Sequence, residues 1–321
     1  MQKLLLNADT NLPSTDGGYF IQTPTEYMSS ILDLNRDDLL QKLTHYGAVM
    51  MRGFQPDINQ FSKFVETVSP QTAIDPARDF FAENVQLVNS GVDEIGLHCE
   101  NGTTPLIPQI VWFYCAQGPQ SGSQTTLCDG VQVWKHLSLR AKHILQSKKV
   151  KFSRNVPHHL WLKYVRHHFP QLANQAEIDQ TLLDAVFHKI PGASANLNWD
   201  GSLLLSYALY LARPTFFGSS MAFANSLFGP SYNYAAPEIN FENGDSLPEW
   251  LLSECRFITE NLTTEIHWMS GDIVVIDNSR VMHGRRRITD PNRKLFTALG
   301  FLKESGQIQS GDATTKEAAC L

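Results

Sequence analysis

The sequence is poor in cysteine, and the spacing of its cysteines predicts neither a disulfide framework nor a zinc site. The five that it has are scattered along 321 residues, odd in number and without a C-x-x-C pair. Such spacing excludes a disulfide-rich secreted domain and a zinc ribbon. The thiols are therefore predicted to be reduced and intracellular. They are Cys99, Cys115, Cys128, Cys255 and Cys320.

Long apolar runs are also missing. The N-terminal region contains a run of only three leucines, which is too short for the core of a signal peptide. No later stretch approaches the length of a membrane span, which is about 20 apolar residues. Cys320 is next to last rather than fourth from the end, so the prenylation pattern is absent. We therefore predict a cytoplasmic protein without a membrane anchor.

Neither sign of charge dominates the chain. Lys and Arg total 26 against 32 for Asp and Glu, which gives a formal net charge of -6. No broad positive field is available to hold nucleic acid or an anionic membrane. The predicted partner is a small molecule, and the composition leaves the oligomeric state open.

The chain does contain enough apolar material for a large core, since 42% of its residues are hydrophobic. No internal repeat is present, and no Pro/Gly/Ser-rich linker divides the sequence. Residues 1–302 are therefore predicted to form a single domain. Residues 303–321 are polar and short of large side chains, and they are predicted to be a disordered tail.

Strand signals gather in two regions that have to pair across a long insertion. The predicted strands cover residues 47–54, 110–115, 272–276 and 294–302. Between the two regions, helical spacing of apolar residues follows Trp134, and alternation around Val150 and Phe152 predicts a strand. Residues 158–168 are predicted to be helical. The aromatic-rich segment 156–265 suits either a cover over a pocket or ordinary core packing.

The chemistry centres on a short motif, His98-Cys-Glu100, which places two metal-binding side chains two positions apart. In an extended segment, residues i and i+2 point to the same face, so both can reach one ion. A third ligand has to come from elsewhere, and His283 follows a predicted strand and turn. Two imidazoles and one carboxylate leave coordination positions open, as Fe(II) requires in order to bind an organic co-substrate and O2 together. An H-x-E motif alone is common by chance, so the combination carries the prediction.

This combination resembles the taurine dioxygenase and clavaminate synthase (TauD/TfdA-like) superfamily over residues 47–302. The resemblance implies a mainly β fold with helices (α+β), built on a double-stranded β-helix, or jelly roll, with a helical and loop insertion. It implies Fe(II), bound by His98, Glu100 and His283, together with 2-oxoglutarate and O2. The matching motifs are His98-Cys-Glu100, Gly271-Asp-Ile-Val-Val-Ile-Asp-Asn-Ser-Arg-Val-Met-His-Gly-Arg285 and Arg293-Lys-Leu295.

The resemblance also implies a 2-oxoglutarate site. Arg293 matches the arginine that pairs with the distal carboxylate, a bidentate contact that suits a planar guanidinium. Thr125 matches the threonine that helps to hold the same carboxylate; Thr126 is the alternative, and strand alternation favours Thr125. Many relatives have a second arginine four residues after the first, where this chain has Thr297. Two residues are candidates to compensate, Arg285 and Arg287.

In enzymes of this type, oxidative decarboxylation of 2-oxoglutarate to succinate and CO2 activates O2 to remove hydrogen from a substrate, usually ending in hydroxylation. Desaturation and oxidative rearrangement use the same ligands, whereas halogenating relatives replace the carboxylate ligand, so Glu100 disfavours halogenation. Glutamate in place of the aspartate of taurine-type enzymes indicates the clavaminate-like branch, which acts on amino acids and their derivatives. Residues 98–114 also resemble members of natural-product pathways that oxidise amino-acid-derived isonitriles. The predicted substrate contacts are Asn101, Gly102, Thr103 and Arg285.

Two other classes are compatible with the sequence. One is a jelly-roll ligand-binding module without redox chemistry, for which the three metal-binding side chains would be a coincidence. The other is a zinc or manganese enzyme that needs no Arg293. Several polar residues are predicted to be structural rather than functional: Asp272 and Asn278 as turn formers, and His158, His159, His167 and His168 as part of the polar face of a helix.

Overall fold

The computed structural model describes residues 18–88, 91–229 and 234–302. Its largest element is an eight-stranded sheet in which the predicted strands 47–54, 272–276, 110–115 and 294–302 become four neighbours. The predicted pairing across the insertion is therefore confirmed. In sheet order the strands are β1 (Phe20–Gln22), β2 (Ala48–Met51), β16 (Ile273–Asp277), β7 (Ile110–Gln117), β18 (Lys294–Phe301), β5 (Val85–Leu87) and β4 (Phe80–Ala82), with β3 (Gln71–Ala73) also paired to β18.

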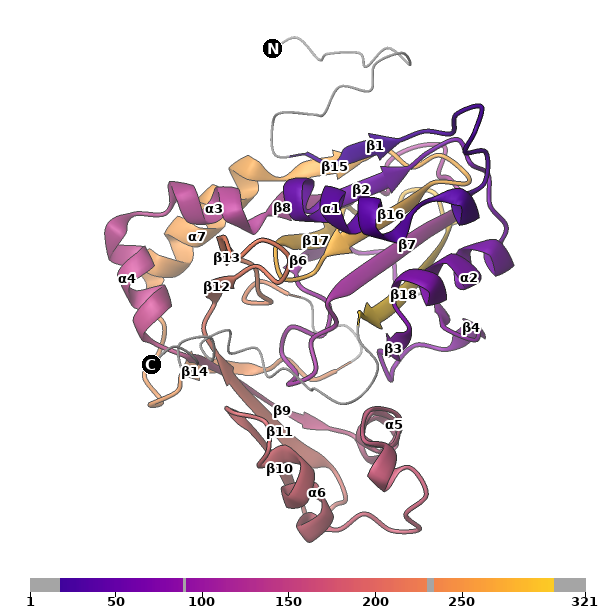
Figure 1. Cartoon of the computed structure of the whole chain (residues 1–321). Helices are drawn as coiled ribbons and strands as arrows, with labels where there is room; N and C mark the ends of the chain where they lie inside the picture. Colours follow the sequence, from indigo (N-terminus) through magenta and orange to yellow (C-terminus); the bar gives the residue numbers. More distant parts are fainter. Residues whose placement is uncertain (1–17, 89–90, 230–233, 303–321) are drawn as a thin grey trace, which may run out of the picture.

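A second, four-stranded sheet packs against the first (Figure 1). The side chains between the two sheets alternate with those on the outer face: Val111 and Phe113 of β7 point inward, while Ile110 and Trp112 point outward. Because both faces of β7 and β16 are covered, these strands are continuous apolar runs. The second sheet contains β15 (Thr264–Ile266), β8 (Thr125–Asp129), β17 (Val281–Arg285) and β6 (Ile95–His98).

Two helices, with a short 3-10 turn (Ile31–Asp33), cover the outer face of the large sheet (Figure 1). They are α1 (Arg36–Tyr46) and α2 (Ile58–Val68). The side chain of Asn35 accepts hydrogen bonds from the first turn of α1, and Gly47 ends that helix in the left-handed conformation with φ 77°. A Cβ at this position would lie 2.7 Å from the Val281 side chain, so glycine suits the position in size as well as in conformation. Because Gly47 adopts this conformation, the chain turns directly from α1 into β2.

Three helices and a hairpin flank the second sheet, where they enclose a separate apolar cluster. The helical spacing that begins at Trp134 corresponds to two short helices. The elements are α3 (Gly130–His136), α4 (Leu139–Ser147), α7 (Glu249–Leu262), β12 (Ala212–Pro214) and β13 (Met221–Phe223).

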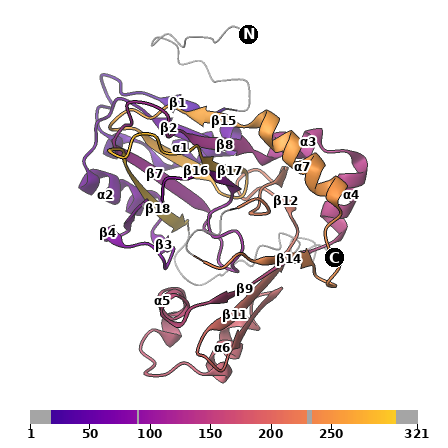
Figure 2. The same ribbon diagram turned by 180° about the vertical axis from the view of Figure 1, so that it is seen from behind.

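The insertion contributes a third sheet, which lies apart from the first two (Figure 2). The predicted strand around Phe152 and the predicted helix 158–168 are both confirmed. Helices pack on this sheet over an apolar cluster that includes Trp161 and Phe187. In sheet order the strands are β10 (Ala193–Leu197), β11 (Leu203–Leu209), β9 (Val150–Val156) and β14 (Glu238–Phe241). The helices are α5 (His158–His168), a 3-10 turn (Pro170–Leu172) and α6 (Gln180–Phe187).

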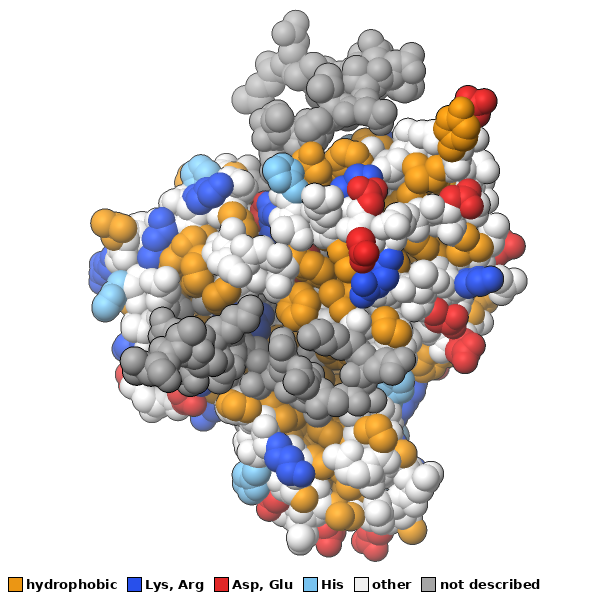
Figure 3. Space-filling model, in the orientation of Figure 1, with side chains coloured by type: hydrophobic (Ala, Val, Ile, Leu, Met, Phe, Trp, Pro, Cys, Tyr) orange, Lys and Arg blue, Asp and Glu red, His pale blue; other side chains and the backbone are white. Residues whose placement is uncertain are grey.

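On the face seen in Figure 3, basic and acidic side chains are scattered rather than gathered into a patch of one sign. Within the described part of the chain, no helix is long and apolar enough to cross a membrane. The predicted tail, residues 303–321, lies outside the described residues.

Candidate metal centre and substrate cavity

Strand pairing brings the two predicted histidine ligands together. His98, the last residue of β6, lies opposite His283 of β17, and their ring centroids are 4.3 Å apart. The Glu100 Oε2 atom lies 3.2 Å from the Nε2 atom of His283 and 3.9 Å from that of His98. One potential ligand atom from each of the three residues lies within 4.8 Å of the others. The three side chains can therefore hold one metal ion.

The route by which Glu100 reaches this point differs from the prediction. His98 ends its strand, and Glu100 lies in the turn that follows rather than on the same face of an extended segment. Asn101 continues the turn with a left-handed φ of 54°. The shared direction of the two side chains thus depends on the turn and not on strand alternation.

Asn278 holds this turn, so its interpretation as a simple turn former was wrong. Its fully buried side chain accepts a hydrogen bond from the Glu100 backbone N–H (2.9 Å) and donates to the carbonyl oxygens of Glu100 (3.0 Å) and Pro108 (2.9 Å). Asp272 does hold a turn, since its carboxylate accepts a hydrogen bond from the Met269 backbone N–H at 2.8 Å, but it is also buried and forms an ion pair with Arg52 at 2.6 Å. Burial of a polar side chain requires partners of this kind.

We expect Asn278→Ala to lower the free energy of unfolding by about 2–4 kcal/mol, because it leaves buried backbone groups of the Glu100 turn without a partner. Metal affinity should fall as well, since Glu100 is no longer held in place. Chemical denaturation and calorimetric metal titration measure the two effects. The matched control is Asn243→Ala at an exposed site; equal losses in both variants would contradict the assigned role.

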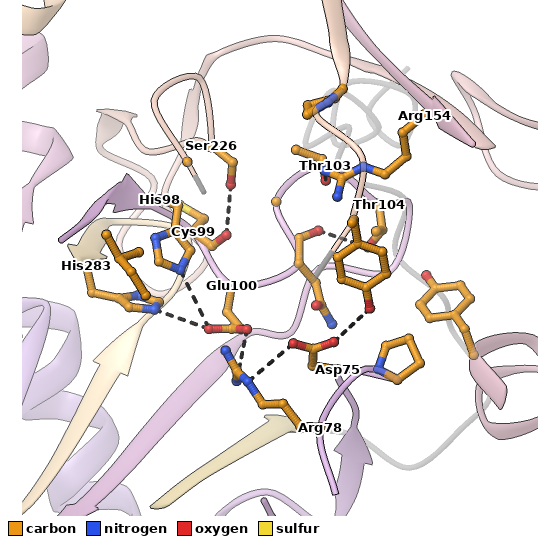
Figure 4. A pocket seen from close by; sticks show the side chains of 18 of the residues that line it. Asp75, Arg78, His98, Cys99, Glu100, Thr103, Thr104, Arg154, Ser226 and His283 are labelled. Carbon is orange, nitrogen blue, oxygen red and sulfur yellow. Dashed lines mark hydrogen bonds and ion pairs between the residues drawn. The ribbon is translucent and has the colours of Figure 1, made fainter. Parts of the chain in front are cut away.

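An arginine that the sequence analysis did not identify contacts the other oxygen of Glu100. The buried Arg78 side chain places Nη1 3.2 Å from Glu100 Oε1 and Nε 3.2 Å from Asp75 Oδ2 (Figure 4). Asp75 also accepts a hydrogen bond from the Tyr234 hydroxyl at 2.8 Å. Glu100 therefore has one oxygen directed at the histidines and the other directed at a cation.

The protonation states in this cluster suit metal binding. Burial, together with the neighbouring His283, lowers the pKa of His98 to about 3, so its ring is neutral at pH 7. Its Nδ1 atom lies 2.9 Å from the Gly96 carbonyl and donates to it, which leaves the lone pair of Nε2 for an ion. Burial alone would raise the pKa of Glu100, but Arg78 and the hydrogen bond from His283 outweigh it and hold the pKa below its usual value. A neutral imidazole and an ionised carboxylate, with the second imidazole beside them, are the side-chain types that fit Fe(II).

A cavity of about 300 Å³ opens beside these residues, between the double-stranded β-helix and the third sheet. Figure 4 shows His98, Glu100 and His283 on one side, with Thr103 and Arg154 on the other. Segment 156–265 therefore does cover a pocket, as one of its two interpretations predicted. It contributes a largely apolar set of lining residues: Val156, Trp161, Tyr164, Phe187, Leu203, Leu205 and Ile239.

The residues predicted for 2-oxoglutarate line the cavity close to one another, since Thr125 pairs with Arg285 across two strands and Arg285 acts on Arg293. Thr125 is buried and lines it, whereas Thr126 does not, so the geometry agrees with the choice of Thr125. The Thr125 hydroxyl oxygen accepts a hydrogen bond from the Trp268 indole N–H (2.9 Å), and its own hydrogen remains available to a ligand. Arg293 donates to the Ser123 carbonyl at 2.7 Å.

The two candidates to replace the second arginine differ in burial and in their position relative to the cavity. Arg285 is buried, donates to the Asp93 carbonyl at 2.7 Å and lines the cavity beside Arg293. Burial and the charge of Arg285 lower the pKa of Arg293 to about 10. Arg287 is exposed and lies outside the lining, so the geometry favours Arg285 of the two. Thr297 is buried in β18 and donates to the Trp112 carbonyl.

The predicted substrate contacts Asn101, Gly102 and Thr103 all line the cavity, but two of them have structural tasks. Asn101 donates to the Ile74 carbonyl at 3.1 Å. A Cβ on Gly102 would lie 2.2 Å from the Ser226 hydroxyl oxygen and 2.9 Å from the Cys99 carbonyl oxygen, so only glycine fits. Of the three, Thr103 is the one whose side chain joins another polar group of the cavity, Arg154.

The histidines of α5 do not form one polar face. His158 and His159 are exposed, and the Nε2 atom of His167 lies 3.1 Å from the Thr72 carbonyl oxygen. His168 is buried, and burial lowers its pKa to about 3, which corrects its prediction as a polar surface residue.

Sequence reasoning missed Asp75, Arg78, Arg154 and Tyr234. One signal was present for Arg154, because it has the same strand parity as the buried residues Phe152 and Val156. An arginine on the apolar face of a strand is unusual unless it faces a cavity or a partner. No comparable signal marks Arg78, which lies in a short turn between three-residue strands.

The double-stranded β-helix with two histidines and one glutamate at its mouth defines the class of non-haem metal oxygenases with a facial ligand triad. Its family is established by a family model that matches residues 22–299: the chain belongs to the taurine catabolism dioxygenase TauD, TfdA family. The predicted fold and the predicted class, an Fe(II)- and 2-oxoglutarate-dependent dioxygenase that uses O2, are thereby confirmed.

Individual relatives are distant but extend over most of the chain. A clavaminate synthase-like protein of Arabidopsis thaliana is 23% identical over 317 residues, covering 87% of this chain and 86% of the relative. The 3-((Z)-2-isocyanoethenyl)-1H-indole synthase of Fischerella ambigua is 22% identical over 271 residues, covering 81% and 84%. The crystal structure of PvcB from Pseudomonas aeruginosa matches with a TM-score of 0.56 at 12% identity, covering 94% and 95%. PvcB is an Fe, α-ketoglutarate-dependent oxygenase of an isonitrile synthetic pathway.

Proposed function

We propose that this chain oxidises a small molecule, most often by hydroxylation, and that the substrate is an amino acid or an amino-acid derivative of natural-product biosynthesis. In this proposal His98, Glu100 and His283 hold Fe(II), while Arg293 and Thr125, with Arg285 beside them, hold the distal carboxylate of 2-oxoglutarate. The observation that carries it is the convergence of three ligand atoms within 4.8 Å at the wall of a cavity. Bound Fe(II) and 2-oxoglutarate would supply O2 activation.

The chain's own residues provide the setting for that chemistry. Arg78 keeps one oxygen of Glu100 engaged, which directs the other oxygen toward the histidines. The apolar lining from α5, α6 and β11 excludes water from the reacting centre. A cytoplasmic location and a single functional domain over residues 1–302 are part of the same proposal.

Desaturation or oxidative rearrangement of an amino-acid-derived isonitrile is the second candidate. It is supported by the names of two relatives, the isocyanoethenyl indole synthase and PvcB of an isonitrile pathway. Both reactions use the same ligand set, so the first experiment applies to both. A non-redox binding module and a zinc or manganese enzyme are the alternatives that it has to exclude.

The experiment measures succinate release from 2-oxoglutarate with Fe(II) and O2 across a library of amino acids, N-acylated amino acids and isonitrile derivatives. We expect at least one class to stimulate release well above the rate without substrate. Arg293→Leu is the control: it should raise the KM for 2-oxoglutarate about 10- to 100-fold, because a charge-assisted contact is lost. Absence of any 2-oxoglutarate-dependent succinate would reject the proposed function in favour of one of the alternatives.

A further inference from the structure

The wall of the cavity formed by the third sheet carries an arginine that has no carboxylate partner among the described residues. Arg154 of β9 is half-buried, donates to the Thr103 hydroxyl oxygen at 2.6 Å and lies over the Tyr234 ring at 5.4 Å. Both of these contacts are to neutral groups. The two internal segments outside the described residues, 89–90 and 230–233, contain no Asp or Glu.

The carboxylates of the cavity, unlike Arg154, have a partner of opposite charge. Asp75 and Glu100, the two carboxylates among the described lining residues, both pair with Arg78 at 3.2 Å. Among the described residues, the lining contains four arginines against these two acids. A substrate ammonium group would therefore find no unpaired carboxylate in the described lining, whereas a substrate anion would find Arg154.

Arg154 is also separate from the proposed 2-oxoglutarate end. It belongs to the third sheet, and the charged or ionisable groups that act on it are Tyr234 and Asp75. Arg293 directly precedes β18 of the large sheet and is influenced by Arg285 instead. The two cationic ends thus lie on different layers that face the same cavity.

We propose that Arg154 binds the carboxylate of the organic substrate, and that the nitrogen of this substrate is uncharged, as in an N-acylated amino acid or another derivative with a neutral nitrogen. The proposal rests on the proposed function and narrows its substrate class. Thr103 orients the guanidinium, and Tyr234 supports one of its faces. The substrate body would contact the apolar residues of the insertion: Trp161, Phe187, Leu203, Leu205 and Ile239.

The desolvation of the Arg154 guanidinium agrees with its assignment as the group that binds a substrate carboxylate. Burial lowers the pKa of Arg154, which reflects a guanidinium that is partly removed from water without a full counter-charge. A carboxylate that accepts two N–H bonds from a guanidinium offsets that cost and is a strong, directional contact. A lysine cannot reproduce the planar, bidentate geometry.

The test compares three sets of probes with phenylalanine, leucine or tyrosine side chains. The reference set is the N-acetyl amino acids. The free amino acids differ from it only at the nitrogen, and the N-acetyl amino acid amides differ from it only at the carboxyl group. Their Kd values are measured by calorimetry on protein loaded with Fe(II) and 2-oxoglutarate without oxygen. We expect the N-acetyl acids to bind about 10- to 100-fold more tightly than the amides, from one charge-assisted pair. The free amino acids should also bind more weakly than the N-acetyl acids, because their ammonium is not paired.

Arg154→Met should remove the preference for acid over amide while leaving the affinity for the amides unchanged, and Arg154→Lys should restore only part of it. Lys151→Met is the matched control, since Lys151 lies on the same strand with the opposite parity and outside the cavity lining. Equal binding of acids and amides by the wild type, or failure of every N-acetyl acid to bind, would overturn the inference. The visible band of the Fe(II)–2-oxoglutarate complex in the same samples separates the two failures: without that band in the wild type, the proposed function itself fails.

Discussion

Replacement of His283 by alanine is expected to abolish 2-oxoglutarate-dependent oxygen consumption, with a loss of about 1,000-fold or more. The side chain supplies one of three ligand atoms within 4.8 Å of one another, and the two that remain cannot enforce a facial arrangement. A metal that activates a substrate contributes several kcal/mol, and each 1.4 kcal/mol corresponds to about a factor of ten in rate. Oxygen-electrode traces and the anaerobic visible band with Fe(II) and 2-oxoglutarate both measure the effect.

The matched control for this change is His159→Ala. His159 lies exposed on α5, and it belongs to a group of histidines for which no metal role is proposed. It should retain the visible band and the wild-type rate. His283→Ala is expected to stay folded, which near-ultraviolet circular dichroism verifies. Unchanged oxygen consumption in folded His283→Ala protein would exclude the proposed triad.

Long apolar strands were the part of the fold that the sequence predicted well. Because β2, β7, β16 and β18 are covered on both faces, they are predominantly apolar segments, which made them recognisable as strands. The short strands β3, β4 and β5 have three residues each and no such pattern. Their segment carries Asp75 and Arg78, so this part of the site could not be found from periodicity.

The metal ligands could be predicted because their chemical types are rare in combination, but the local geometry could not. Strand alternation predicted that the Glu100 side chain points to the same side as His98, which is correct. The cause is different, since a turn held by Asn278 sets the direction of this side chain. The partner of that turn lies 178 residues away in the sequence, and a contact of this range leaves no local signal. Side chains that position a site from a distance are therefore harder to predict than the ligands that they position.

Arg78→Met is expected to lower turnover about 10- to 100-fold and to weaken or shift the visible band of the Fe(II)–2-oxoglutarate complex. Groups that orient a metal ligand typically have effects of this size. Without the ion pair to Oε1, the Glu100 carboxylate is free to rotate, and it would no longer present a single oxygen to a metal held by the histidines. The free energy of unfolding of the metal-free protein should fall by about 3–5 kcal/mol, because two buried carboxylates lose their cation.

Loss of stability alone would not distinguish a positioning residue from a structural one, so the visible band and the conservative variant decide. Arg78→Lys keeps the positive charge, but an ammonium group pairs with one carboxylate more readily than with two. Compared with Arg78→Met, this variant should therefore regain most of the free energy of unfolding and only part of the visible band. Arg287→Met, at an exposed arginine outside the cavity lining, is the control and should match the wild type. If Arg78→Met keeps a wild-type band and rate while losing stability, Arg78 stabilises the fold around Asp75 and has no part in orienting Glu100. If the band changes in Arg78→Met and recovers in part in Arg78→Lys, the orientation of the carboxylate ligand depends on the guanidinium that holds its second oxygen.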